Sequence, residues 1–165
     1  MWCSEHQLSL EPGPDPLKPE WSVSLTDETA GARIRKALNL LKQLLDPPHA
    51  EGDDRQWVGR VKEGLEELEF ALREDAPMKA QFLKETTRSH PRLTPICAAF
   101  YEDGRKLLIQ TTVVVRLSAE DHEKVAGSTT ELRAATESLV EAVEQYRHLA
   151  SEISLEAGYD IGGQG

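Results

Sequence analysis

The 165-residue chain has few of the residues that usually build reactive or metal-bound sites. Its two cysteines, Cys3 and Cys97, are too few for a disulfide framework and too far apart for a Cys-x-x-Cys site. Such sparse cysteine is typical of a reducing compartment, so we expect a cytoplasmic protein. No stretch approaches the roughly 20 apolar residues of a membrane span, and residues 1–6 do not begin a signal peptide. The sequence therefore predicts no membrane contact.

The chain also lacks an excess of basic residues. It carries 19 Lys and Arg against 29 Asp and Glu, a net charge of −10, which disfavours nucleic acid and anionic membranes as partners. One stretch, residues 79–106, reverses this balance, with six basic residues and three acidic ones. Two interpretations are open for it: complementary faces of packed helices, or a site for a small anion or an acidic partner.

The hydrophobic content, 39%, is sufficient for a globular core in a chain of this length. Residues 1–25 are the exception, because four closely spaced prolines preclude a helix there: Pro12, Pro14, Pro16 and Pro19. We expect an arm that is either mobile or laid along the fold, with Trp2 and Trp21 as anchors. Trp21 is the better anchor because Val23 and Leu25 lie beside it.

Helical periodicity begins after this arm. Thr26 is a suitable N-cap, and the pair Pro47-Pro48 ends the first predicted helix. Asp53 or Asp54 begins a second helix, and Pro77 is expected to break or restart it. The apolar stripes of these two helices are Ala30, Ile34, Ala37, Leu38, Leu41, Leu44 and Leu45, and then Val58, Val61, Leu65, Leu68 and Leu72, with Trp57 beside the second.

The third helix is harder to predict from its composition. Thr94 and Pro95 are good start signals, yet residues 107–117 (LLIQTTVVVRL) have the propensity of a strand. No second run of that kind exists to pair with it, and a lone strand would leave its backbone groups unsatisfied. We therefore predict a helix. Residues 118–121 either continue this helix or begin a short new one.

The last helix has the clearest pattern. Residues 128–131 (STTE) have the form of a capping box, and Gly158 supplies a stop. Its apolar face consists of Leu132, Ala135, Leu139, Val143, Tyr146, Ala150, Ile153 and Ala157. The sequence therefore predicts an all-α fold, an up-and-down four-helix bundle over residues 26–160 with an irregular proline-rich N-terminal arm (1–25) and a flexible tail (161–165).

A helical bundle can hold metals between facing helices through inward His and Glu pairs. None of the five histidines lies in a Glu-x-x-His motif, and no two stand four residues apart. One His-x-x-x-Glu exists, His148 with Glu152, but on a helical wheel it points away from the apolar stripe. We interpret it as a solvated pair, and Cys97 as a buried structural thiol. No nucleophile elbow or phosphate loop is present.

Two short motifs resemble the hemerythrin-like family of four-helix bundles, which bind iron in the bundle core. Pro91-Arg92-Leu93 is similar to the start of the third helix in some bacterial members, and residues 155–163 (LEAGYDIGG) resemble the ending of such members. The resemblance implies the same helix order over residues 26–160. It also implies positions for the iron ligands, which can be compared one by one.

This chain departs from the family at most of those positions. Residues 26–46 contain no histidine, and Glu69-Phe70 and Arg73-Glu74 stand where the family has His-Phe and Glu-Glu. Asp103-Gly104 takes the place of a Glu-His pair. Only His148 and Glu152 resemble retained ligands, and one pair cannot make a di-iron site. The resemblance implies the fold, and we predict no metal or other cofactor.

Three classes of function come into question on this basis. The preferred one is a metal-free helical-bundle interaction or regulatory module with a protein partner. The alternative is a hemerythrin-like non-haem iron protein that binds oxygen or senses redox state. An enzyme with a site assembled across helices has no positive sign in the sequence, so no catalytic residue is predicted.

Overall fold

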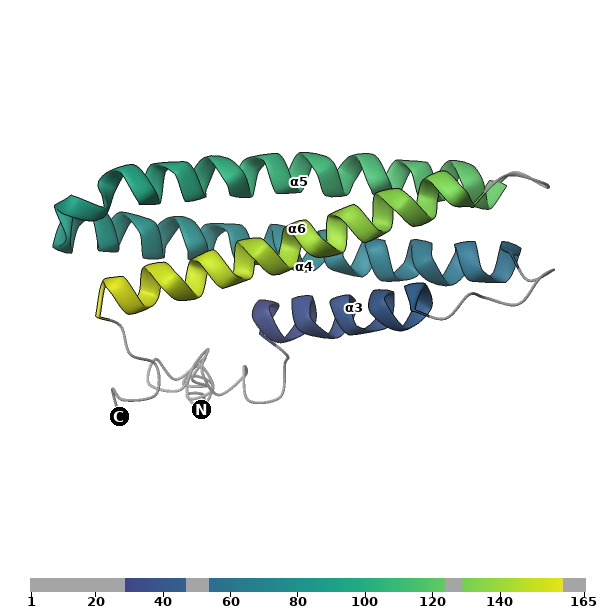
Figure 1. Cartoon of the computed structure of the whole chain (residues 1–165), viewed down its shortest axis with the longest axis horizontal. Coiled ribbons are helices and arrows are strands. Elements are labelled where there is room, and N and C mark those ends of the chain that lie inside the picture. Colours follow the sequence, from purple (N-terminus) through teal and green to yellow (C-terminus); the bar gives the residue numbers. More distant parts are fainter. Residues whose placement is uncertain (1–28, 47–53, 124–128, 159–165) are drawn as a thin grey trace, which may run out of the picture.

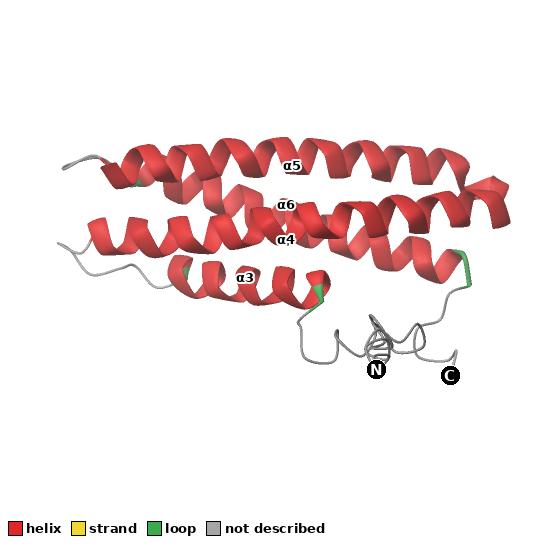
Figure 2. Ribbon diagram, turned by 180° about the vertical axis from the view of Figure 1, so that it is seen from behind, coloured by secondary structure: helices red, strands yellow, loops and turns green. Residues whose placement is uncertain are grey.

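A computed structural model of the chain describes residues 29–46, 54–123 and 129–158. Those residues form a bundle of four α-helices and one 3-10 helix, shown in Figures 1 and 2: α3 (Ala30–Leu45), α4 (Asp54–Ser89), η1 (Pro91–Leu93), α5 (Thr94–Glu123) and α6 (Thr130–Glu156). Successive helices run in opposite directions, and this confirms the all-α, up-and-down four-helix bundle. The predicted arm and tail lie outside the described residues.

Helix α3 begins later than the sequence predicted. Thr29 is its N-cap, with an extended backbone and a side chain that accepts a hydrogen bond from the Ala32 N–H at 3.1 Å. The predicted cap, Thr26, lies outside the described residues. At the other end, the Trp57 indole N–H donates to the Leu44 carbonyl at 2.8 Å and Arg133 donates to the Leu45 carbonyl at 2.9 Å. Donors from α4 and α6 thus satisfy carbonyls that a helix end leaves free.

Pro77 does not break the second helix, and this part of the prediction was wrong. Helix α4 is continuous over 36 residues with Pro77 inside it. Proline removes the backbone hydrogen bond to the carbonyl four residues earlier, here that of Arg73, and this costs about 3 kcal/mol. Buried side chains lie on both sides of Pro77, from Leu72 to Leu83. Packing of the two flanking segments, chiefly against α3, η1 and α5, outweighs the local cost.

The strand-like run 107–117 lies inside α5, as the pairing argument predicted. The Thr111 hydroxyl donates to the Leu107 carbonyl at 2.7 Å, which satisfies a buried polar group within the helix. The helix continues through Ser118 to Glu123, so no separate short helix begins there. It starts at Thr94, one residue before the predicted position, directly after η1.

Helix α6 buries its predicted face. The N-cap of α6 is Thr129, whose side chain makes no capping hydrogen bond, and Ser128, with which the predicted capping box begins, lies outside the described residues. The helix ends at Glu156, and Gly158 follows with φ 80°, a left-handed conformation that favours glycine. The backbone of Gly158 donates to the Leu155 carbonyl at 3.0 Å.

The helices differ in length, and this divides the core. At 1.5 Å per residue, α3 is about 24 Å long and α4 about 54 Å long, so α3 covers only part of its neighbour. Figure 1 shows α6 crossing the bundle obliquely, towards the side on which α3 lies. The larger apolar cluster joins all four helices. The smaller one lies at the three-helix end and consists of Leu83, Leu93, Cys97, Phe100, Ile153 and Ala157.

Across the described ranges, no helix is both long enough and apolar enough to span a membrane.

Candidate functional site

The pair His148 and Glu152 lies on the surface of α6. Its Nε2 and Oε1 atoms are 3.3 Å apart, and the two side chains are 75% and 55% exposed. This agrees with the helical wheel, on which the two side chains point away from the apolar stripe. An exposed i, i+4 pair of this kind contributes a few tenths of a kcal/mol, about 0.3–0.5, to helix stability.

The other positions compared with the hemerythrin-like family make surface contacts. Glu69 pairs with Arg73 at 3.6 Å, and Glu74 pairs with Arg33 of α3 at 2.6 Å. Within the part of the chain that the structure describes, no three His, Cys, Asp or Glu side chains come together as a possible metal site. The iron-ligand pattern of the family therefore has no counterpart among these residues.

The remaining cysteine and histidine residues considered in the sequence analysis do not form a common site among the described residues. Cys97 is a buried free thiol in the smaller apolar cluster, as predicted. His122 packs over the backbone of Gly59, and His90 lies at the start of η1. Cys3, His6 and His49 lie outside the described residues.

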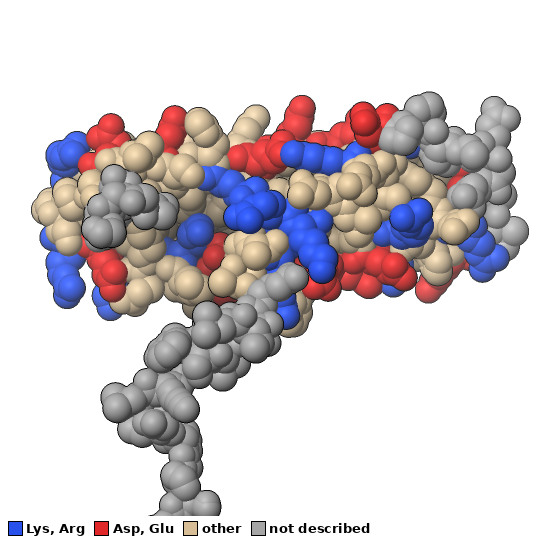
Figure 3. Space-filling view, turned by 90° about the horizontal axis from the view of Figure 1, so that it is seen from below, with Lys and Arg blue, Asp and Glu red and all other residues tan. Residues whose placement is uncertain are grey.

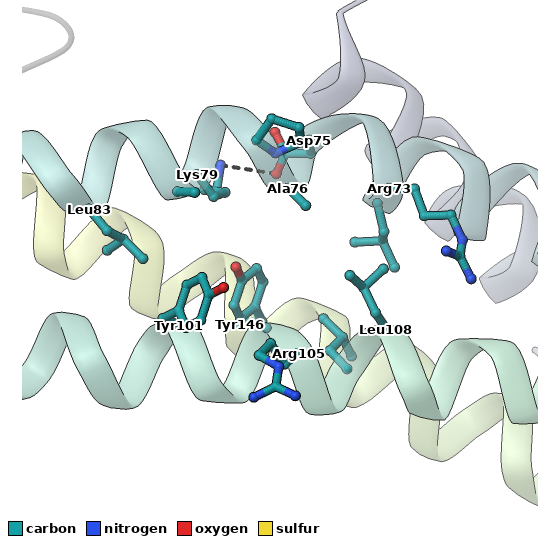
Figure 4. Close-up of a pocket in the computed structure, with 14 residues that line it drawn as sticks. Arg73, Asp75, Ala76, Lys79, Leu83, Tyr101, Arg105, Leu108 and Tyr146 are labelled. Carbon is teal, nitrogen blue, oxygen red and sulfur yellow. Dashed lines mark ion pairs between the residues drawn. The ribbon is translucent and has the colours of Figure 1, made fainter.

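The structure brings together three residues that sequence reasoning did not connect. Asp75 of α4 is buried and pairs with Lys79 at 3.3 Å, and the hydroxyl of Tyr146 of α6 faces this pair across the hollow in Figure 4. Burial raises the pKa of Tyr146 to about 12, with further contributions from the negative charges of Asp75 and Asp103.

Tyr146 is held in place by two contacts with α5. Its ring stacks on Phe100 with centroids 4.3 Å apart and an angle of 7° between the ring planes. Its hydroxyl lies over Gly104, where an added Cβ would stand 2.8 Å from the hydroxyl oxygen. Any side chain at position 104 would displace the tyrosine. The absence of a side chain at Gly104 thus makes room for Tyr146.

Two hollows flank this group. The α4–α5 cavity, about 350 Å³, is bounded by both helices and by Tyr146. The α4–α6 groove, about 660 Å³, lies on the other side, and the first turns of α3 close one end of it through Gly31 and Ile34. Leu72, Asp75, Lys79 and Tyr146 line both hollows and form the wall between them.

Comparison with known protein families, with curated proteins and with solved structures finds no match for this chain. The hemerythrin-like resemblance therefore stays a prediction. The two hollows and the residues that line them are the candidate functional site.

One signal in the sequence pointed towards this region. The basic stretch 79–106 contains Lys79 and Arg105, which line the α4–α5 cavity from two helices. The charge pattern did not predict that Asp75 and Tyr146 belong to the same site, because their proximity depends on how α4, α5 and α6 align with one another.

Proposed function

We propose that this chain is a helical interaction module that binds an amphipathic helix of a partner protein in the α4–α6 groove. The observation that carries the proposal is the mismatch in helix length. Helix α3 has 16 residues and α4 has 36, so about 30 Å of α4 in total lies beyond the length that α3 can cover, divided between the two ends of α3, as Figure 1 shows. A helix laid in line with α3 would restore four-helix packing along this part of the bundle.

The lining of the groove suits a helix. Its floor contains Leu72, Tyr146 and Ala150, which are buried or half-buried, and Ser151 and Ser154 line it from α6. Small side chains allow close approach of a helix, since helices pack with axes about 8–10 Å apart. Leu155, which is 70% exposed, adds an apolar contact at the edge. An amphipathic helix with apolar residues at i, i+3, i+4 and i+7 fits this surface.

The charges of this face favour an acidic partner. Lys79 and Arg147 line the groove, and Figure 3 shows basic side chains gathered in the middle of the face, with acidic ones along its edges. The two acidic groove residues are already paired, Glu144 with Lys42 of α3 and Asp75 with Lys79. Carboxylates flanking the apolar stripe of the partner helix would complement Arg147 and the remaining ammonium donors of Lys79.

The partner helix is assigned to another polypeptide. The residues before α3 are the nearest alternative occupant, but the spacing of their four prolines predicts no helix over residues 1–25. An extended segment anchored by Trp21 would be a different arrangement, and the experiment below separates the two.

The test is binding of a synthetic amphipathic peptide to the full chain, followed by fluorescence anisotropy. The probe has a leucine stripe flanked by glutamates, and its control has the same composition in scrambled order. We expect Ser151→Arg, which places a long side chain in the groove, to weaken binding about tenfold or more. Gln145→Arg adds the same side chain to an exposed position of α6 that does not line the groove, and it should leave the affinity within about twofold.

Three results would contradict the proposal. The scrambled peptide might be bound equally well, or Ser151→Arg and Gln145→Arg could have the same effect. A large gain in peptide affinity in Trp21→Ala would instead identify the chain's own N-terminal residues as the occupant of the groove.

A further inference from the structure

The α4–α5 cavity lies where small residues occupy facing positions of two helices. Ala76 and Ala80 line it from α4, and Gly104 lines it from α5. Leu83 and Leu108 lie at its two sides in Figure 4. Its volume of about 350 Å³ is within the range of about 300–1,000 Å³ that is usual for small-molecule sites.

The charged groups around this cavity leave it without a net charge. Asp75 and Lys79 line it as a pair, with their charged atoms 3.3 Å apart. In Figure 4 the guanidinium groups of Arg73 and Arg105 point away from the hollow. Both groups have carboxylate partners on their own helices. A charged ligand would therefore be taken from water without a counter-charge, which is costly, and a neutral ligand is favoured.

The walls of the cavity are mainly apolar. Leu72, Leu83 and Leu107 line it and are buried. The rings of Tyr101 and Tyr146 add aromatic surface from α5 and α6. Small-molecule sites typically combine such walls with a few placed polar groups that orient the ligand. The polar groups of this cavity therefore indicate which neutral ligand it suits.

Two phenol hydroxyls are the hydrogen-bond donors that remain. In Figure 4 the hydroxyls of Tyr101 and Tyr146 point towards the Asp75–Lys79 pair across the hollow. Neither hydroxyl makes a hydrogen bond with a residue that the structure describes. Burial raises the pKa of Tyr146 to about 12, so its hydroxyl keeps its proton at neutral pH and can donate. A ligand that supplies an acceptor would satisfy these donors.

We propose that the α4–α5 cavity binds a small neutral molecule with an apolar body and one carbonyl oxygen, of the class of simple ketones. A carbonyl oxygen has two lone pairs, so it can accept from the hydroxyls of both Tyr101 and Tyr146. The apolar body lies along Ala80, Leu83 and Leu108. This inference is independent of the partner-helix proposal, because Ala80, Leu83 and Tyr101 do not line the α4–α6 groove.

The test compares three probes of similar size on the full protein: acetophenone, α-methylstyrene and benzoate. In α-methylstyrene a methylene group replaces the carbonyl oxygen, and benzoate carries a net charge. Titrations followed by amide nuclear magnetic resonance give both affinity and location. We expect saturable binding of acetophenone, with shifts at Ala76, Ala80 and Gly104. Binding of α-methylstyrene should be about three- to tenfold weaker, and binding of benzoate about tenfold weaker or worse.

Matched variants separate the role of the hydroxyls from damage to the fold. The quantity measured is the ratio of the affinities for acetophenone and α-methylstyrene, because a general loss of packing weakens both. Tyr101→Phe and Tyr146→Phe should each lower this ratio, and the double variant should bring it to about one. Ala80→Phe should abolish binding of both probes by filling the cavity. Ala99→Phe, at an exposed position of α5 that does not line the cavity, should leave both affinities within about twofold.

The proposal is overturned if acetophenone shows no saturable binding, if α-methylstyrene or benzoate binds as tightly, or if the double variant keeps the preference for acetophenone. It is also overturned if Ala99→Phe weakens binding as much as Ala80→Phe. The groove variant Ser151→Arg should leave acetophenone affinity unchanged. Loss of peptide binding alone would therefore reject the partner-helix proposal and leave this one standing.

Discussion

A buried hydroxyl on α4 offers a sharp test of the packing described above. Thr86 is fully buried, and its Oγ1 atom has no hydrogen-bond partner among the described residues. An unsatisfied buried polar group costs about 1–3 kcal/mol, whereas an apolar group of the same shape at that place carries no such cost. Valine has nearly the shape of threonine and similar helix propensity. We expect Thr86→Val to raise the free energy of unfolding by about 1–2 kcal/mol.

Two other buried threonines provide matched controls. The hydroxyls of Thr111 and Thr136 donate to the carbonyls of Leu107 and Leu132, each at 2.7 Å, and both residues are fully buried. Replacement by valine removes a hydrogen bond worth about 0.5–1.5 kcal/mol and gains a buried methyl group worth about 0.8 kcal/mol. Thr111→Val and Thr136→Val should therefore be close to neutral or slightly destabilising.

The assay is urea unfolding followed by far-ultraviolet circular dichroism, with thermal melting as a second measurement. For a chain of this length a gain of 1 kcal/mol raises Tm by about 2–4 °C. The reasoning is refuted if Thr86→Val destabilises the protein as much as the two controls do. That result would mean that the Thr86 hydroxyl makes a stabilising hydrogen bond.

Three further predictions concern the wall between the hollows, the helix proline and iron. The pKa of Tyr146 is raised from 10.0 to about 12, so its stabilising effect is fully present below pH 10 and is lost as pH rises towards 12; denaturant titrations across this range should show a shallower loss of stability in Tyr146→Phe than in the natural chain. Pro77→Ala restores a backbone donor inside α4 and should stabilise the protein by about 1–3 kcal/mol in urea unfolding, while a loss of stability would show that the ring is needed for packing. Protein purified from iron-supplemented cells should contain far less than one iron per chain by metal analysis; stoichiometric iron with a near-ultraviolet charge-transfer band would support the hemerythrin-like alternative instead.

The helices and their buried faces were predictable because these signals are local. Stripes such as Val58, Val61 and Leu65 repeat at helical spacing within one segment, and the structure buries each of them. The strand-like run 107–117 could also be assigned correctly, because no other segment was available to pair with it. The arm, by contrast, was predicted from residues that lie outside the described structure.

The errors occurred where tertiary packing overrides a local signal. Pro77 is a reliable local breaker, yet α4 continues through it because both flanking segments bury apolar side chains. The start of the first helix was placed at Thr26 rather than Thr29, since several polar residues there can serve as caps. The capping box predicted at Ser128 lies outside the described residues.

By itself, the sequence determined the helical class, the faces that become buried and the absence of a recognisable ligand motif, because each depends on residues close together in the chain. The tertiary structure alone decided which side chains meet. Asp75, Gly104 and Tyr146 come from three helices, and their contact depends on the alignment of those helices. The same alignment leaves Ala76 and Ala80 opposite Gly104, which opens the cavity. The difference in helix length accounts for the α4–α6 groove, since a short α3 against a long α4 leaves the groove open.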